Sequence, residues 1–148
     1  MPDILHRVAV KSSPNDAYKG LATQEGLADW WTADTKGDFG VGGVIVFRFG
    51  DRGHIDMKVL ELQPGRRVAW EVVGGPAEWI GSKVGFDLAP EDDFTVVRFK
   101  HQGWKEPSEF MHHCSTKWAT FLMSLKSLVE TGRGAAYPND VRIGNKGD

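Results

Sequence analysis

The chain has 148 residues, of which 41% are hydrophobic and 26% charged, and its formal net charge is -2. This length suits one domain, which we expect to span residues 1–132 and to be followed by an extended or disordered tail over residues 133–148. The mixed charges argue against nucleic acid as a partner, which would need clustered Lys and Arg. No segment reaches the roughly 18 uninterrupted apolar residues of a membrane span.

The start of the sequence and its cysteine content indicate a cytoplasmic protein. MPDILHRVAV lacks the basic segment and the longer apolar segment of a secretory signal. Cys114 is the only cysteine, so it has no intrachain disulfide partner.

The first thirty residues predict one strand and two short helices. Residues 4–11 are partly alternating and rich in β-branched side chains, which is typical of a strand. Ser13 is a good N-cap and Pro14 suits the first helical position, so a helix begins there. Thr23 offers a second cap for a helix that ends near Trp31.

From Thr32 onward, alternating segments separated by turn residues predict antiparallel strands. Their expected ranges are 45–49, 54–62, 67–74, 79–88 and 94–101. Apolar residues of the segment 54–62 fall in both phases, which indicates either a bulge near Val59 or burial of both faces. Trp79 has the outward phase of its strand and, if exposed, would mark a self-association surface. Strands in succession without intervening helices form an antiparallel meander.

Pro107 to Gly132 predicts one long amphipathic helix. Its apolar stripe contains Met111, Cys114, Trp118, Phe121, Leu122, Leu125, Leu128 and Val129. A helix of this length needs a large apolar surface to lie on, and the meander supplies one, so we expect an α+β fold. The second half of the helix should be plain packing, whereas the first turns, from Glu109 through Trp118, are where we expect any function.

The order of these elements resembles the START-like, helix-grip superfamily, also called SRPBCC. Within it the chain resembles the branch related to the activator of the heat-shock-protein-90 ATPase. The matching stretches are Ser13-Pro14, GLADWW at 26–31, Gly42-Gly43, VLELQPGRRVAWEV at 59–72, TVVRFKHQG at 95–103 with Trp104, and Trp118 to Gly132. The resemblance implies a curved antiparallel sheet wrapped around the last helix, two short helices between the first and second strands, and an apolar cavity. Relatives bind lipids or hormones, cyclise polyketides or contact the chaperone, so it leaves the function open.

Aromatic residues on several elements predict an apolar ligand pocket between sheet and helix. Its expected lining is Trp30, Trp31, Phe47, Trp70, Phe86, Phe99, His101, Trp104, Met111, Cys114 and Trp118. Apolar walls with a few polar groups are the usual makeup of small-molecule sites. The alternative is that all these side chains simply form the core, as large apolar residues mostly do.

His101 is the best candidate for a polar group in this pocket, because it is in phase with Val97 and Phe99. If buried, its neutral form would be favoured, which suits a hydrogen-bonding or acid/base group. The alternative is a satisfied core histidine. His112, about 100° round the helix from Met111, either lines the mouth of the pocket or points to solvent.

Other site chemistries are poorly supported, and we expect neither metal nor cofactor. His112, His113 and Cys114 are consecutive on a helix and so point in three directions, which does not make a tetrahedral metal site. Cys114 falls on the apolar stripe, where burial raises the pKa of a thiol and keeps it inert. The glycines at 40, 42 and 43 precede a strand, so they do not form a dinucleotide-binding loop.

The first hypothesis is therefore a small cytoplasmic module that binds a hydrophobic or aromatic small molecule, lipid-like or polyketide-like, in this pocket. The second is a cyclase-like or hydrolase-like enzyme acting on such a ligand, with His101 as acid or base. The third, which rests on the resemblance, is contact with the chaperone. Self-association as a homodimer is a further expectation.

Overall fold

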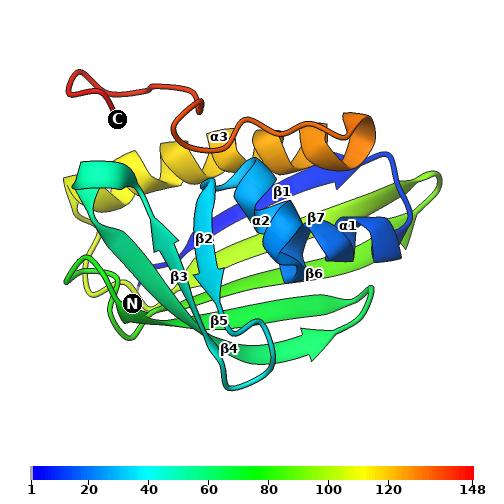
Figure 1. Ribbon diagram of the computed structural model, residues 1–148, viewed down its shortest axis with the longest axis horizontal. Coiled ribbons are helices and arrows are strands. Elements are labelled where there is room, and N and C mark those ends of the chain that lie inside the picture. The colour runs from blue at the N-terminus through cyan, green and yellow to red at the C-terminus, as the bar shows by residue number, and fades with distance from the viewer. Residues whose placement is uncertain (1) are drawn as a thin grey trace.

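A computed structural model describes residues 2–148. Its elements are β1 (Ile4–Val10), α1 (Pro14–Ala22), α2 (Gln24–Trp30), β2 (Asp34–Gly37), β3 (Val44–Arg48), the short 3-10 helix η1 (Gly50–Arg52), β4 (His54–Gln63), β5 (Arg67–Gly74), β6 (Lys83–Glu91), β7 (Phe94–Gln102) and α3 (Glu109–Thr131). The seven strands form one antiparallel sheet in the order β1-β7-β6-β5-β4-β3-β2. Figure 1 shows α3 lying across the curved sheet, with α1 and α2 beside it. The expected α+β helix-grip fold is confirmed.

Local capping determines where the helices begin and end. The Ser13 hydroxyl accepts a hydrogen bond from the Asp16 N–H, and Pro14 occupies the first helical position. At the start of α3 the Ser108 hydroxyl accepts from the Met111 N–H. Gly132 ends α3 in the left-handed conformation with φ of 86°, which suits a residue without Cβ.

The two short helices cross closely because glycines lie at their contact. A Cβ atom on Gly26 would lie 2.7 Å from the Gly20 Cα, so the two helices could not come this close with a larger residue at position 26. A Cβ atom on Gly20 would instead lie 3.1 Å from the Leu125 side chain of α3. The Trp30 indole N–H donates to the Gly20 carbonyl at 2.7 Å and fixes this crossing. The chain then reaches Trp31, which ends α2, facing the interior.

The core fills the space between α3 and the concave face of the sheet. Phe86 pairs with Phe99 across β6 and β7, and their ring centroids are 5.3 Å apart in an edge-to-face arrangement. Burial of each such side chain stabilises the fold by about 1.5–3 kcal/mol. The largest fully buried side chains include Trp30, Trp70, Trp104, Phe47, Phe86 and Phe99.

Residues 79–88 were predicted to form one strand, and this prediction is wrong for residues 79–82. Residues 76–82 form a turn, in which the Trp79 and Ile80 N–H groups both donate to the Pro76 carbonyl, and β6 begins at Lys83. Apolar alternation continued through the turn and concealed it. Ile80 is consequently exposed, and Trp79 is 5% exposed, so it offers no outward self-association surface.

The ambiguity in β4 is resolved as a bulge, which is one of the two expected alternatives. The register shifts between Val59 and Glu61, opposite Trp70 and Ala69 of β5. A bulge moves the following residues to the opposite phase, which explains why the apolar pattern of β4 changes at Leu60.

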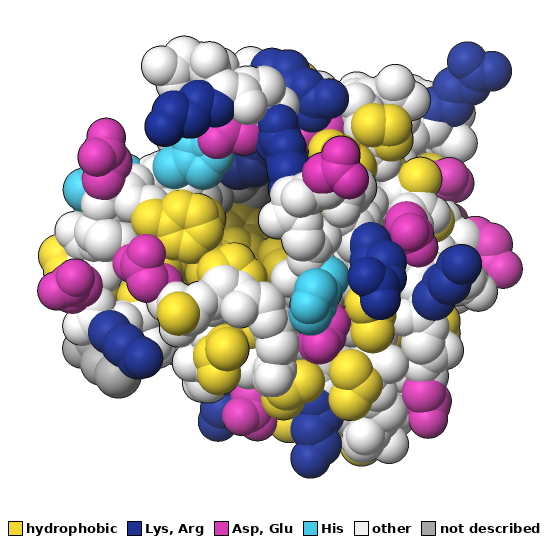
Figure 2. All heavy atoms as spheres, turned by 60° about the vertical axis from the view of Figure 1, so that its left-hand side comes forward, with side chains coloured by type: hydrophobic (Ala, Val, Ile, Leu, Met, Phe, Trp, Pro, Cys, Tyr) yellow, Lys and Arg dark blue, Asp and Glu magenta, His cyan; other side chains and the backbone are white. Residues whose placement is uncertain are grey.

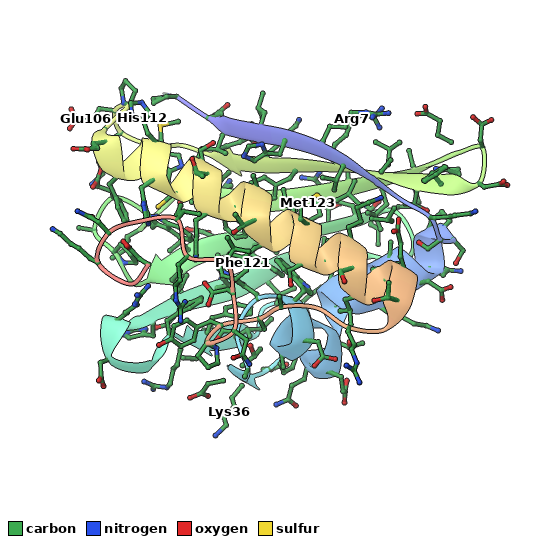
Figure 3. The ribbon with its side chains drawn as sticks, turned by 90° about the horizontal axis from the view of Figure 1, so that it is seen from above. Arg7, Lys36, Glu106, His112, Phe121 and Met123 are labelled. Carbon is green, nitrogen blue, oxygen red and sulfur yellow. The ribbon has the colours of Figure 1, made fainter. Side chains whose placement is uncertain are left out.

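Residues 133–148 pass back over the protein on the side of α3 opposite β1, as Figure 3 shows from above. The Tyr137 N–H donates to the Trp31 carbonyl at 2.9 Å, and the Ala33 N–H donates to the Tyr137 carbonyl at 3.0 Å. Further along, Asp140 forms an ion pair with Lys117 of α3 at 2.5 Å. We call residues 133–148 the C-terminal segment below.

Candidate functional site

A cavity of about 190 Å³ opens beside the first half of α3. Its other walls come from the region between β3 and β4, which contains η1, from the turn between β5 and β6, and from the C-terminal segment. Figure 2 shows it as a hollow with hydrophobic side chains inside and histidine and basic side chains at its edge. Its lining is Trp31, Phe49, Arg52, Gly53, His54, Ile55, Pro76, Trp79, Phe110, His113, Cys114, Lys117, Trp118, Phe121 and Asp148.

Three tryptophans form much of the apolar interior of the cavity. The Trp118 ring lies 5.0 Å from the Trp31 ring and 5.9 Å from the Trp79 ring, between centroids. Trp31 is fixed from behind by Phe47, at 4.3 Å. Rings held by neighbours on several elements form a preorganised wall, on which a flat apolar molecule can pack without displacing the core.

The charged and histidine side chains of the lining lie at the edge of this cavity, as Figure 2 shows. His54 is paired with Asp56, at 2.8 Å between Nδ1 and the carboxylate. Lys117 is paired with Asp140, which belongs to the C-terminal segment.

The remaining edge groups also contact that segment. Arg52 donates to the Gly147 carbonyl, and the His113 Nε2 lies 3.4 Å from the Asp148 carboxylate. The C-terminal segment therefore supplies the partners of three edge side chains, those of Arg52, His113 and Lys117.

One wall of the cavity carries an unusual donor. The Trp79 indole N–H finds no hydrogen-bond acceptor among residues 2–148, although the side chain is buried. The Cys114 thiol lies beside it and is only a weak acceptor. Burial raises the pKa of this thiol to about 12, and the Trp79 indole opposes the rise only in part. Cys114 is thus a neutral wall group and no nucleophile at physiological pH.

Three of the residues expected from the sequence line this cavity, namely Trp31, Cys114 and Trp118. The others lie deeper, in the continuous core under α3 or near its first turn. They are Trp30, Phe47, Trp70, Phe86, Phe99, His101, Trp104 and Met111. Phe121, expected as plain packing, instead lines the cavity.

His101 is fully buried and both of its ring nitrogens are engaged. The Trp118 indole N–H donates to Nδ1 at 3.2 Å, so Nε2 carries the ring proton and donates to the Ser82 hydroxyl at 2.8 Å. The hydroxyl in turn donates to the Trp79 carbonyl. Burial lowers the pKa of His101 to about 3. In this arrangement His101 stays neutral and holds two cavity walls, Trp118 and Trp79, in position.

The two histidines at the start of α3 point to different surroundings. His112 is exposed and, in Figure 3, lies on the side of the helix away from the C-terminal segment, whereas His113 lines the cavity. Among residues 2–148, no group of three or more His, Cys, Asp or Glu side chains is arranged to hold a metal ion. None of the helices in the described part of the chain is long and apolar enough to cross a membrane.

Several lining residues were missed by sequence reasoning. Three of them lie on the predicted long helix, namely Phe110, His113 and Lys117. Each directly precedes a residue of the predicted apolar stripe, so a stripe widened by one position on that side would have included them. Phe49, residues 52–55 and Asp148 carry no local signal, because they reach the cavity only through contacts between distant segments. Trp79 was missed because residues 79–88 were predicted as one strand, which assigned Trp79 to the outward face. In the structure Trp79 belongs to the turn before β6.

Known proteins share both the sequence pattern and the fold. Residues 11–130 match the family described as Activator of Hsp90 ATPase homolog 1-like protein. The solution structure of the Aha1 dimer from Colwellia psychrerythraea is 44% identical, covers 90% of this chain and 100% of that chain, and has a TM-score of 0.83.

More distant structures show the same fold. A crystal structure of a Mesorhizobium loti protein is 20% identical, with 86% and 96% of the two chains covered and a TM-score of 0.73. CalU16 from Micromonospora echinospora is 22% identical, with 86% and 73% covered and a TM-score of 0.67. No curated protein sequence matches significantly.

Proposed function

The chain belongs to the Activator of Hsp90 ATPase homolog 1-like family, and from this premise we propose that it is a small cytoplasmic protein that binds a hydrophobic or aromatic small molecule in the cavity beside α3. The observation that carries the proposal is the preformed cavity of about 190 Å³ with tryptophan walls. Concave, mostly apolar sites with a few polar groups are the usual form of small-molecule sites.

Binding is a better proposal than turnover for this site. An acid or base needs a nitrogen or oxygen that can reach a ligand, and His101 has both nitrogens engaged inside the core. Cys114 lines the cavity, but its thiol is neutral at physiological pH because burial raises its pKa to about 12. The lining thus supplies contacts and orientation, as a binding site requires.

A neutral fluorescent probe tests the proposal. N-phenyl-1-naphthylamine, whose emission rises in apolar surroundings, should bind saturably with one site per chain. Cys114→Phe, which places a ring in the cavity, should abolish this binding. Thr116→Phe is the matched control, because it adds the same ring at an exposed position of the same helix and should leave binding intact.

The proposal is overturned if the probe does not bind saturably, or if Cys114→Phe binds as well as the control. A thermal unfolding curve of both variants establishes that each one folds. Cys114→Ser removes the thiol but keeps the cavity, so this variant should still bind the probe. It therefore shows whether Cys114→Phe loses binding because the cavity is filled or because the sulfur is absent.

Chaperone contact is a second candidate, which the family match favours. It predicts that the protein co-purifies with the heat-shock-protein-90 chaperone and stimulates its ATPase activity. If the purified protein leaves the ATPase rate unchanged at saturating concentration, this candidate fails, while ligand binding is unaffected.

Self-association is proposed from the similar Colwellia structure, which is a dimer. Light scattering coupled to size-exclusion chromatography should give a mass twice that of the 16.4 kDa chain. A mass of one chain across the concentration range would contradict it.

A further inference from the structure

We infer that this cavity takes a small aromatic anion, with a carboxylate as its charged group, which replaces the Asp148 carboxylate at the edge. The inference rests on the proposed function, since it names the chemical class of the same ligand. Three observations carry it: the size and aromatic walls of the cavity, two edge donors whose polar contacts are with the C-terminal segment, and the incompletely satisfied carboxylate that now faces those donors.

The cavity size limits the apolar part of the ligand. A dry cavity of about 150 Å³ accommodates benzene, and this one is about 190 Å³ with an opening to solvent. One or two aromatic rings therefore fit. Trp31 and Trp79 each pack against Trp118, with centroid separations of 5.0 and 5.9 Å, and these aromatic walls make favourable contacts with the rings of a ligand.

Two donors at the edge are available to an incoming charge. His54 is held by Asp56 and Lys117 by the buried Asp140, so both are already matched to a carboxylate. The polar contacts that the structure gives to Arg52 and His113 are with Gly147 and Asp148. A guanidinium beside an imidazole is a good receptor for a carboxylate, because both present N–H groups to its oxygens.

The carboxylate that now occupies this place is incompletely satisfied, although backbone N–H groups and the neighbouring His113 and Arg52 lower its pKa. Asp148 lies 3.4 Å from His113, longer than a strong charge-assisted bond, and its Oδ1 is buried with no hydrogen-bond partner in the described chain. A buried oxygen without a donor carries a free-energy cost. A ligand anion that engages its donors at shorter distance is therefore favoured over Asp148 in the same position.

Calorimetric titration with 2-naphthoate and 2-naphthamide tests the charge, since the two probes have nearly the same shape. Wild-type protein should bind naphthoate about tenfold tighter than naphthamide, which is the scale of one or two charge-assisted bonds near the surface. Arg52→Gln and His113→Gln should each weaken naphthoate about threefold or more and leave naphthamide unchanged. Arg66→Gln, an exposed arginine in the turn between β4 and β5, is the matched control and should change neither.

Asp148→Asn tests the competition directly. Removal of its charge should tighten naphthoate about threefold and leave naphthamide unchanged. Equal affinity of the two probes for the wild type, or an unchanged naphthoate affinity in Asp148→Asn, overturns the inference. Naphthamide and N-phenyl-1-naphthylamine would still bind in that case, so the proposed function would stand; failure of all three probes overturns both.

Discussion

His101 contributes to the way in which the stability of the protein depends on pH. Burial lowers its pKa to about 3, against an ordinary value of 6.5, so between these values the unfolded chain binds a proton that the folded chain does not. The free energy of unfolding must then fall as the pH falls from 6.5 towards 3. By pH 5 the loss from this group should be about 2 kcal/mol relative to neutral pH.

Urea unfolding at pH 7, 6 and 5 measures this loss. His101→Gln cannot take up the proton, so its free energy of unfolding should depend less on pH over this range, although the variant is less stable throughout because the Ser82 and Trp118 contacts change. Parallel pH curves for the two proteins would show that His101 does not stay neutral in the fold.

The Cys114 thiol should be almost unreactive in the folded protein. With its pKa raised to about 12 by burial, the thiolate is scarce at pH 8. Allowing for the greater nucleophilicity of a more basic thiolate, reaction with a disulfide reagent should be about a hundredfold slower than for the unfolded chain. Absorbance of the released thiol, with and without guanidinium, measures both rates, and equal rates would contradict the burial.

Among the elements, the crossing of α1 and α2 depends on a glycine. Gly26→Ala should destabilise the protein by about 1–3 kcal/mol, because the new Cβ would lie 2.7 Å from the Gly20 backbone. Helix propensity alone predicts the opposite sign, a gain of about 1 kcal/mol. Thermal unfolding distinguishes the two, with Gly40→Ala as a control whose Cβ meets only an Asp38 oxygen at 3.5 Å.

The elements were largely predictable, whereas the cavity was not. Strong local signals, such as Ser13-Pro14 and the stripe through Met111 and Leu125, specify helices before any packing is known. The turn at 76–82 escaped because its apolar spacing imitates a strand. Cavity residues such as Arg52 and Asp148 are far apart in sequence, and periodicity carries no information about contacts between them. Periodicity also does not distinguish a side chain that lines a cavity, such as Trp118, from one that only packs, such as Phe99.

For the whole molecule, the pair of Lys117 and Asp140 ties the C-terminal segment to α3. The Asp140 side chain is 2% exposed and that of Lys117 14%, so loss of the carboxylate leaves a poorly hydrated ammonium. Asp140→Ala should cost about 2 kcal/mol, below the 3–5 kcal/mol of a fully buried pair.

Hydrogen exchange gives the local readout of that change. The amides of Ala33 and Tyr137, which bond to the Tyr137 and Trp31 carbonyls, should exchange faster in Asp140→Ala. Lys146→Ala, an exposed change in the same segment, should leave both amides protected. Unchanged protection in Asp140→Ala would show that the segment is held without the ion pair.

The pairing of β1 with β7 has a consequence for biosynthesis. Ile4 lies opposite His101 and Val10 opposite Thr95, so the first strand cannot complete its place in the sheet until about ninety further residues have been translated. At 5–20 residues per second this takes about 5–20 s, during which its apolar residues remain uncovered on the nascent chain. Contacts of such long range also slow folding itself. The sheet can therefore close at β1 only after β7 has been synthesised, and until then the apolar side chains of β1 have no partner strand.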